Sequence, residues 1–242
     1  MQVYAAGSLV AALKDVIAAS GLPVETVAPP TFGPAGLLRQ RIEAGEKADL
    51  YLSADLAGPR RLAAAGIARD VVPFARNRLC VYAHADHGLT ADNLIDRLLK
   101  PDLRLATSTP GADPGGDYAF AVFDRAEAEH PGAKAVLEKK ALRLLGSPNT
   151  MVPVAGRSPA ATVFLGNNAD ALLYYCSGQG DTTKEVPGLS VVQLPSSLSV
   201  PATYAMALIS DNPDAMRLAL FLVSEKGQAI LARHELEPIS GP

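Results

Sequence analysis

Four loops rich in glycine, serine, threonine or proline hold the residues that could do chemistry in this sequence. These loops are residues 7–8, 30–36, 107–116 and 156–159. Each comes directly before a segment with an apolar helical pattern, so each predicts the N-terminus of a helix. Backbone N–H groups at a helix N-terminus, together with nearby hydroxyl groups, can bind a small anion without a buried cation. The four loops together therefore predict an anion-binding site.

The first loop is the most clearly defined of the four. The strand-like run of residues 3–6 leads into Gly7 and Ser8, and an apolar helical pattern opens at Leu9. The Ser8 hydroxyl is expected to cap this helix, because a serine at the N-cap accepts a hydrogen bond from the first-turn N–H groups. Taken alone, this turn is more typical of a simple helix cap than of a ligand site, and it is the other loops that favour a ligand.

The common catalytic motifs are missing from the sequence. It has no Gly-x-Ser-x-Gly elbow, no Walker loop, no His-Glu-x-x-His pair and no Gly-x-Gly-x-x-Gly loop. Cys176 could act as a nucleophile, but a thiol inside an apolar strand is more often inert. Residues 84–87 (HADH) include metal-ligand types, yet they follow a strand and are typical of a solvated turn. We expect a binding protein rather than an enzyme, with no catalytic residue, no cofactor and no bound metal cation.

Alternating strands and helices are expected to position the loops. In the first third of the chain, strand-like segments are 3–6, 24–28, 49–53 and 71–74, and helical patterns cover 8–20, 35–44 and 55–65. Gly21, Gly45 and Gly66 stand just past these helices, where C-cap glycines belong. The β-α-β order predicts a parallel sheet with right-handed crossovers, which places every strand-to-helix loop at one edge of the sheet.

The rest of the chain continues this α/β pattern. Further strands are expected at residues 79–83, 103–106, 171–175, 190–194 and 202–209. Helices are expected at residues 94–99, 117–129, 133–141, 213–224 and 225–234, together with a short helix that ends at Leu165. Asp113 and Asp117 border the third glycine-rich loop. Because their carboxylates would repel an anion, we expect them to point outward or to cap the helix.

Composition narrows the classes of protein that this chain can be. With 242 residues, 48% of them apolar, it can form one large or two small globular domains. The formal net charge is −3 and Lys and Arg do not cluster, which argues against a nucleic-acid partner. No run of about 18 apolar residues is present, so no direct membrane insertion is expected. Cys80 and Cys176 fit no metal-ligand spacing and are either buried thiols or one disulfide.

Two runs in the first third of the chain are distinctive. They are residues 3–9 (VYAAGSL) and residues 38–55 (LRQRIEAGEKADLYLSAD). Later, Tyr175 with Ser177 ends a predicted strand, and Pro201 precedes a return strand. Together these residues resemble the periplasmic molybdate-binding proteins of ABC transporters, a branch of the type II solute-binding proteins. The likeness is strong in residues 1–83 and thin between residues 110 and 170.

The resemblance implies a periplasmic-binding-protein type II fold of class α/β, with two lobes. Each lobe would be a mainly parallel sheet flanked by helices. Lobe 1 would comprise residues 1–78 plus 199–242, and lobe 2 would comprise residues 79–198. Two crossing strands, near 76–82 and 197–203, would form the hinge. A small oxyanion would bind in the cleft between the lobes, where closure expels water and strengthens each donor contact.

The resemblance also suggests which groups donate to the ligand. The family's first-loop serine falls on Ser8, beside Gly7, and its tyrosine hydroxyl falls on Tyr175. A backbone donor from the second lobe falls near Gly115. These positions match the family pattern, so they are expected to bind the ligand.

The family's second serine falls near Pro34, which is a departure from the pattern. Proline has neither a hydroxyl nor a backbone N–H to donate. The hydroxyl of Thr31, or the N–H groups of Ala35 and Gly36, would therefore substitute for the missing serine.

Arg157 is a second departure, because the family usually has an apolar residue there. Its guanidinium is either a surface group or a ligand residue with a fixed charge and a bidentate fork. Such a charge would suit a carboxylate, a phosphate-like group or a strongly held oxyanion. The complete expected ligand-binding set is Gly7, Ser8, Thr31, Ala35, Gly36, Gly115, Arg157 and Tyr175.

The function implied is that of the substrate-binding component of an ABC importer. It would capture a molybdate- or tungstate-like oxyanion and deliver it to a membrane permease. The same fold with another oxyanion or a small organic acid is the first alternative, and a cytoplasmic anion sensor or small α/β enzyme is the second. Because Met1 leads directly into a strand, a periplasmic location requires that a signal peptide has been removed. A monomer is expected.

Overall fold

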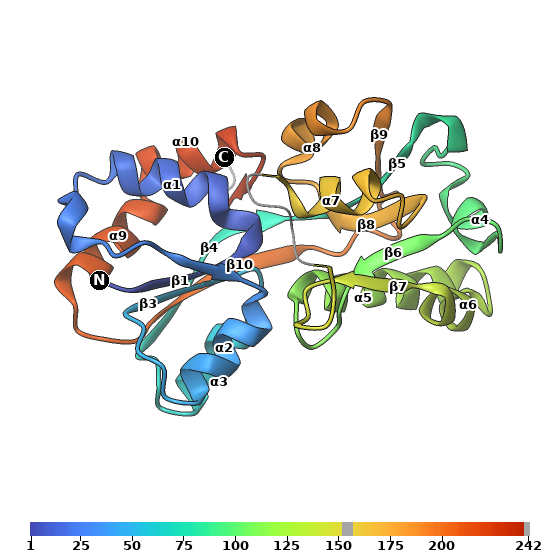
Figure 1. Cartoon of the computed structure of the whole chain (residues 1–242). Coiled ribbons are helices and arrows are strands. Elements are labelled where there is room, and N and C mark those ends of the chain that lie inside the picture. Colours follow the sequence, from blue (N-terminus) through green and yellow to red (C-terminus); the bar gives the residue numbers. More distant parts are fainter. Residues whose placement is uncertain (152–156, 240–242) are drawn as a thin grey trace. The chain divides into compact units, whose positions relative to one another are not determined.

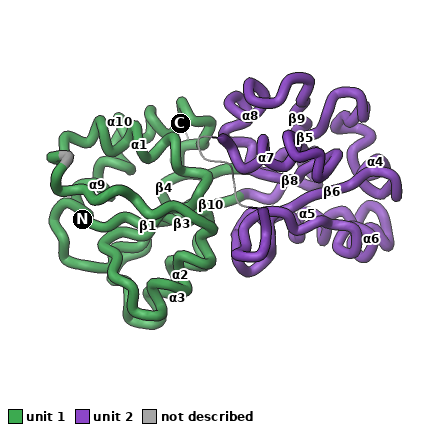
Figure 2. The backbone as a smooth tube through the Cα atoms, in the orientation of Figure 1, with its two compact units in different colours: residues 1–77, 202–242 green, residues 78–201 purple. Residues whose placement is uncertain are grey.

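The computed structural model describes residues 1–151 and 157–239, and the chain forms two compact units. Unit 1 comprises Met1–Asn77 and Ala202–Pro242, and unit 2 comprises Arg78–Pro201 (Figure 2). The chain therefore passes from one unit to the other twice, after Asn77 and after Pro201. Each unit has its own sheet with helices on both faces.

Unit 1 contains a six-stranded sheet with the strand order β11-β4-β10-β3-β1-β2. The strands are β1 (Val3–Ala6), β2 (Thr31–Gly33), β3 (Leu50–Ser53), β4 (Asp70–Asn77), β10 (Ala202–Leu208) and β11 (Glu237–Pro238). The helices are α1 (Val10–Ala19), α2 (Ala35–Glu43), α3 (Ala57–Ala64), α9 (Pro213–Val223) and α10 (Glu225–Arg233), with short 3-10 turns η1 (Gly7–Leu9) and η2 (Val24–Thr26). Helices α1, α9 and α10 cover one face of this sheet, and α2 and α3 cover the other (Figure 1).

Unit 2 contains a five-stranded sheet with the strand order β7-β6-β8-β5-β9. The strands are β5 (Leu79–His84), β6 (Leu105–Ser108), β7 (Leu142–Leu145), β8 (Ala171–Tyr175) and β9 (Leu189–Gln193). The helices are α4 (Leu94–Leu99), α5 (Pro114–Glu129), α6 (Ala133–Lys140), α7 (Pro159–Leu165) and α8 (Gln179–Glu185), with the 3-10 turn η3 (Ala85–His87). Helices α7 and α8 lie on one face, and α4, α5 and α6 lie on the other (Figure 1).

Most strands of each sheet run in one direction, as expected, but one internal strand of each sheet opposes its neighbours. In unit 1, β1 is parallel to β2 and β3, whereas β10 is antiparallel to β3 and β4. In unit 2, β6 is parallel to β7 and β8, whereas β5 is antiparallel to β8 and β9. β5 and β10 are the first strands after the two crossings between units. Each sheet is therefore completed by a strand that enters from the other unit.

The second strand of the chain differs from its predicted position. Residues 24–28 form no strand, because Val24–Thr26 is a 3-10 turn. The strand is β2, which lies inside the proline-rich segment that was expected to be a loop. β2 is an edge strand, where neighbouring prolines interrupt no central ladder. Strands β7 and β11 and helix α8 also lie in segments for which no element was predicted.

The C-cap predictions for the first three helices are confirmed. Gly21, Gly45 and Gly66 have φ values of 73°, 94° and 71°, in the left-handed region that favours glycine. The part of the chain that the structure describes contains no helix long and apolar enough to cross a membrane.

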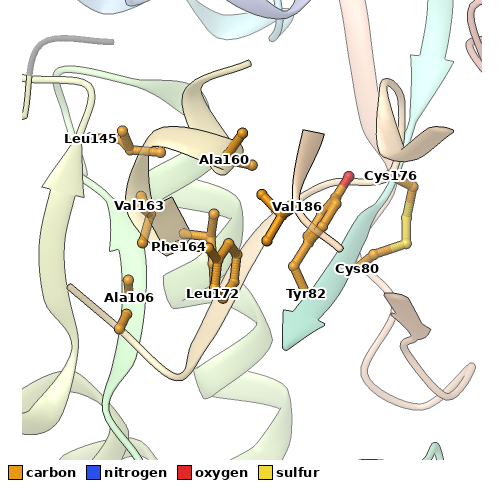
Figure 3. Packing of buried hydrophobic residues seen from close by; sticks show 12 residues of the cluster. Cys80, Tyr82, Ala106, Leu145, Ala160, Val163, Phe164, Leu172, Cys176 and Val186 are labelled. Carbon is orange, nitrogen blue, oxygen red and sulfur yellow. A yellow bond between two sulfur atoms is a disulfide. The ribbon is translucent and has the colours of Figure 1, made fainter. Parts of the chain in front are cut away.

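Unit 2 has a buried apolar core that includes a disulfide. Cys80 and Cys176 are bonded, with their Cα atoms 5.0 Å apart, so the open choice between thiols and a disulfide is resolved (Figure 3). Both cysteines belong to the buried cluster that includes Tyr82, Phe164 and Leu172. Cys176 therefore has no free thiol that could act as a nucleophile.

Candidate functional site

The first predicted loop and the second lie side by side in unit 1. Strands β1 and β2 are parallel, with Ala6 paired to Gly33, so the residues that follow them emerge at the same edge. A Cβ placed on Gly7 would lie 3.9 Å from the carbonyl oxygen of Gly33. The structure thus brings Gly7 and Ser8 close to the start of α2, as parallel strand order predicts.

Ser8 does not cap a helix, which corrects the prediction. It lies inside the 3-10 turn η1, and neither η1 nor α1 has a side-chain cap. Its Oγ is 2.8 Å from the hydroxyl of Tyr204, and Asn77 Nδ2 donates to the same hydroxyl at 3.1 Å. Tyr204 and Asn77 are almost completely buried, at 0% and 3% exposed. The turn aims the Ser8 hydroxyl into a polar network that we call the Ser8 cluster (Ser8, Asn77 and Tyr204).

The N-terminus of α2 has no side-chain cap. Its N-cap residue is Pro34, so the first-turn N–H groups, which include those of Ala35 and Gly36, receive no side-chain acceptor. The Tyr51 hydroxyl donates to the carbonyl of Ala35 at 2.7 Å and holds this turn against β3. Burial raises the pKa of Tyr51, so its hydroxyl stays protonated and able to donate. The turn presents backbone donors beside Ser8.

Thr31 is not brought to this edge. It starts β2 and pairs with Tyr4, at the opposite end of the strand from Pro34. Its neighbours in a surface pocket are Gln2, Glu46 and Lys47. The Thr31 hydroxyl therefore does not replace the missing serine, because the strand carries it away from Ser8.

A second cluster forms in unit 2 at the carboxyl ends of β6 and β8, which are parallel. These strands end at Ser108 and Tyr175, and α5 begins nearby. A Cβ on Gly115 would lie 3.2 Å from Tyr175 Cε2 and 3.5 Å from Ser108 Oγ. We call these three residues the Ser108 cluster. Gly115 and Tyr175 were predicted from the sequence, and Ser108 was not. The sequence feature that could have identified Ser108 is its position in the third predicted loop.

The two aspartates beside this cluster bind backbone groups. Asp113 is the N-cap of α5 and accepts from the N–H of Gly115 at 3.0 Å. Asp117 accepts from the N–H of Gly111 at 2.8 Å. The expected capping role of Asp113 is confirmed, and it has a consequence for the site. The Gly115 N–H, a predicted ligand donor, donates to Asp113 in this structure.

Arg157 lies beside the start of α7 and faces a carboxylate. Its side chain is 47% exposed, and its guanidinium is 3.9 Å from Glu185 Oε2. The same carboxylate accepts from the backbone N–H of Ser158 at 3.1 Å, and Ser158 caps α7. Gly156, in the fourth predicted loop, lies outside the described residues. In unit 2 the charge of Arg157 is therefore partly compensated by Glu185.

Both clusters consist of uncharged groups. Among the described residues, the buried polar side chains are Ser53, Asn77, Thr107, Ser108, Thr162 and Thr182. The described residues also contain no group of three or more His, Cys, Asp or Glu side chains that could hold a metal ion. Hydroxyl and N–H donors at strand ends are suited to an oxyanion, because they supply hydrogen bonds in a desolvated setting.

Comparisons with known proteins agree with this arrangement. The family model "Bacterial extracellular solute-binding protein" matches residues 1–236. Protein PM1146 from Pasteurella multocida (strain Pm70) is 39% identical over 193 residues, which cover 77% of each chain.

Two solved structures share the fold. The periplasmic molybdate-binding protein of Azotobacter vinelandii has a TM-score of 0.75 at 18% identity, covering 100% of this chain and 99% of that one. The sulfate-binding protein SubI from Mycobacterium tuberculosis has a TM-score of 0.79 at 17% identity, covering 99% and 87%. The expected two-lobed periplasmic-binding-protein fold is thereby confirmed. The chain belongs to the family of bacterial extracellular solute-binding proteins.

Proposed function

We propose that this protein is the periplasmic substrate-binding component of an ABC importer and that its ligand is a small tetrahedral oxyanion of the molybdate or tungstate type. The observation that carries the proposal is the Ser8 cluster beside the uncapped start of α2. Ala35 is buried at this helix start, and N–H donors of a helix end that no side chain caps are satisfied by another group. A bound oxyanion would satisfy those donors and the Ser8 hydroxyl together.

The proposed donors are uncharged hydroxyl and N–H groups. This supports the proposal that the ligand is an oxyanion, which would itself bring the charge of the complex. Buried anions in proteins are stabilised by several hydrogen bonds from N–H and O–H groups as well as by cations. The proposed donors are Ser8, Ala35 and Gly36 in unit 1 and Tyr175 in unit 2, with Gly7 allowing close approach of the backbone. The Gly115 N–H is left out of this set because it donates to Asp113.

Arg157 and Thr31 are left out of the proposed donor set. The Arg157 guanidinium already faces Glu185, and Thr31 lies at the far end of β2. Without Arg157, every remaining donor in the set is uncharged. Such a set favours a symmetric tetrahedral dianion over an asymmetric carboxylate. The expected partner is the membrane permease of the importer, to which a monomeric binding protein would deliver the anion.

A different ligand on the same fold is the second candidate, and Asp113 is the observation that favours it. Its carboxylate accepts a hydrogen bond from the N–H of Gly115, so this N–H is not available to a dianion. SubI, a structural neighbour, is named as a sulfate-binding protein. The Cys80–Cys176 disulfide weighs against a cytoplasmic sensor or an enzyme with a Cys176 nucleophile, because disulfides persist in oxidising compartments.

A thermal-shift panel tests the proposal. The purified protein is heated with molybdate, tungstate, sulfate, phosphate, acetate or citrate, each at a matched ionic strength. A ligand present at about 100 times its Kd raises Tm by about 5–10 °C for a chain of this size. We expect the largest shift with molybdate or tungstate. A larger shift with sulfate or a carboxylate would select the second candidate, and no shift with any anion would contradict both.

A further inference from the structure

Among the described residues, a buried hydroxyl in unit 2 has no hydrogen-bond partner. Ser108 is 0% exposed, and no described residue bonds its Oγ. Folded proteins pair the large majority of their buried polar groups, so a hydroxyl left open at a strand end needs an explanation. An anion bound at this strand end would accept a hydrogen bond from this hydroxyl.

Ser108 stands where the strand is irregular. The pairing of β6 with β7 shifts register between Thr107 and Ser108, which pair with Arg143 and Leu145. Such a bulge re-aims the side chain at the end of a strand and is common next to functional sites. The chain turns after Ser108 into the glycine-rich loop that begins α5.

The re-aimed hydroxyl points to the N-terminus of α5. Ser108 Oγ is 3.5 Å from the position that a Cβ on Gly115 would occupy, in the first turn of this 16-residue helix. The positive end of the helix dipole favours an anion at this place, and it acts there against the carboxylates of Asp113, which caps the helix, and of Asp117 in the first turn. The Gly115 N–H donates to Asp113, which leaves the Ser108 cluster short of one donor.

We infer that Ser108 is a ligand-binding residue whose hydroxyl donates to an oxygen of a tetrahedral oxyanion at the N-terminus of α5. This inference rests on the proposed function and deepens it, because it adds a donor that the family resemblance did not assign. Ser108 compensates for the backbone N–H that Asp113 occupies. The Ser108 hydroxyl would donate to the anion in place of that N–H.

The test compares Ser108→Ala with Thr107→Val in calorimetric titrations with sodium molybdate and sodium sulfate. Thr107 is a matched control, because its buried hydroxyl also has no partner among the described residues but does not adjoin Gly115. Ser108→Ala is expected to raise the Kd of the anion that binds the wild type by about tenfold. Its Tm without ligand should not fall, because the lost hydroxyl made no bond. Thr107→Val should leave the Kd unchanged.

The outcomes separate this inference from the proposed function. If the wild type binds an anion and Ser108→Ala binds it equally well, the inference is overturned and the function stands. If Ser108→Ala and Ser108→Gly both lose affinity together with Tm, the role of Ser108 is structural and the inference also fails. If the wild type binds neither molybdate nor sulfate in the titration, the ligand proposal fails first, and with it the inference.

Discussion

The Ser8 side chain contacts a partner that its local sequence does not predict. Its type and its position after a strand identified it as a donor, and the loop pattern predicted a helix cap. The structure instead pairs its hydroxyl with Tyr204, a residue 196 positions away. Local sequence holds no information about such a partner, because Tyr204 arrives on β10 after the chain has returned from unit 2. The sequence could select Ser8 as a candidate residue, but it could not predict the orientation of its side chain.

Tyr204 is expected to position Ser8 rather than to bind the ligand. Tyr204→Phe removes the phenol oxygen that Ser8 contacts and should raise the Kd for the bound oxyanion about three- to tenfold, the range for one lost hydrogen bond. A double-mutant cycle with Ser8→Ala tests the link by calorimetry. Once Ser8 is alanine, Tyr204→Phe should cost little more affinity, whereas fully additive losses would show that the two residues act independently.

Arg157 is expected to lie outside the ligand site. Arg157→Ala removes a half-exposed guanidinium that faces Glu185 and should change the Kd for the oxyanion by less than about twofold, since exposed ion pairs contribute little. The same titration on Glu185→Gln is the matched control for the ion pair. A tenfold loss of affinity in Arg157→Ala alone would return this residue to the ligand set.

The elements could be predicted better than their pairing. Helix α4 and strand β8 have the predicted ends, and the three C-cap glycines stand where expected. β2 was predicted in the wrong place for two reasons. The apolar pattern at residues 24–28 fits both a strand and a turn, and the three residues of β2 are too few to show an alternation of apolar and polar side chains. The inserted strands β5 and β10 could not be recognised as antiparallel, because their partners are set by the two crossings between units. Ser108 was missed for a related reason, since its bulge depends on the unpredicted strand β7.

In the loop between α2 and β3, the Glu46 carboxylate is bound by Arg41 of α2 and by Tyr4 of β1, and these bonds predict a pH effect. Arg41 donates to Glu46 through Nε at 2.6 Å and through a terminal nitrogen at 2.5 Å, and the Tyr4 hydroxyl also donates to this carboxylate. The bonds from Arg41, followed by that from Tyr4, lower the pKa of Glu46 from 4.5 to about 2. A lowered pKa stabilises the folded state above pH 4.5, and this contribution is lost as the pH falls toward 2.

Glu46→Gln should therefore make the free energy of unfolding less dependent on pH below about pH 4.5. Urea midpoints measured from pH 6 to pH 2.5 should differ most between wild type and variant above pH 4.5, and the two curves should converge toward pH 2.5. Arg41→Gln should produce a similar convergence, because it removes the main cause of the shift. Parallel curves over the whole range would contradict the assignment.

The disulfide is expected to stabilise unit 2. It joins the start of β5 to the residue after β8 and closes a separation of 96 residues. Replacing both cysteines by alanine should lower the free energy of unfolding by about 2–4 kcal/mol, as measured by urea denaturation. Anion affinity in native buffer should be retained, since neither cysteine is a proposed donor. An unfolding midpoint unaffected by this replacement or by reduction would contradict the stabilising role.

At the scale of the whole molecule, two units each offer one cluster of neutral donors at the carboxyl ends of parallel strands. The family membership is established by a match over residues 1–236, and the two-lobed fold agrees with it. The chain departs at Pro34 and Arg157 from the pattern of the molybdate-binding proteins that it resembles. The molecule therefore belongs to the solute-binding class, and we propose that the Ser8 and Ser108 clusters select its ligand.

We propose that uncharged N–H and O–H donors of the Ser8 and Ser108 clusters take part in binding the oxyanion. Isothermal titration with molybdate, or with the anion that gives the largest thermal shift, measures stoichiometry and affinity for the wild type, Ser8→Ala and Tyr175→Phe. We expect each substitution to raise the Kd about tenfold or more. Binding that neither substitution weakens would contradict the proposed donor set.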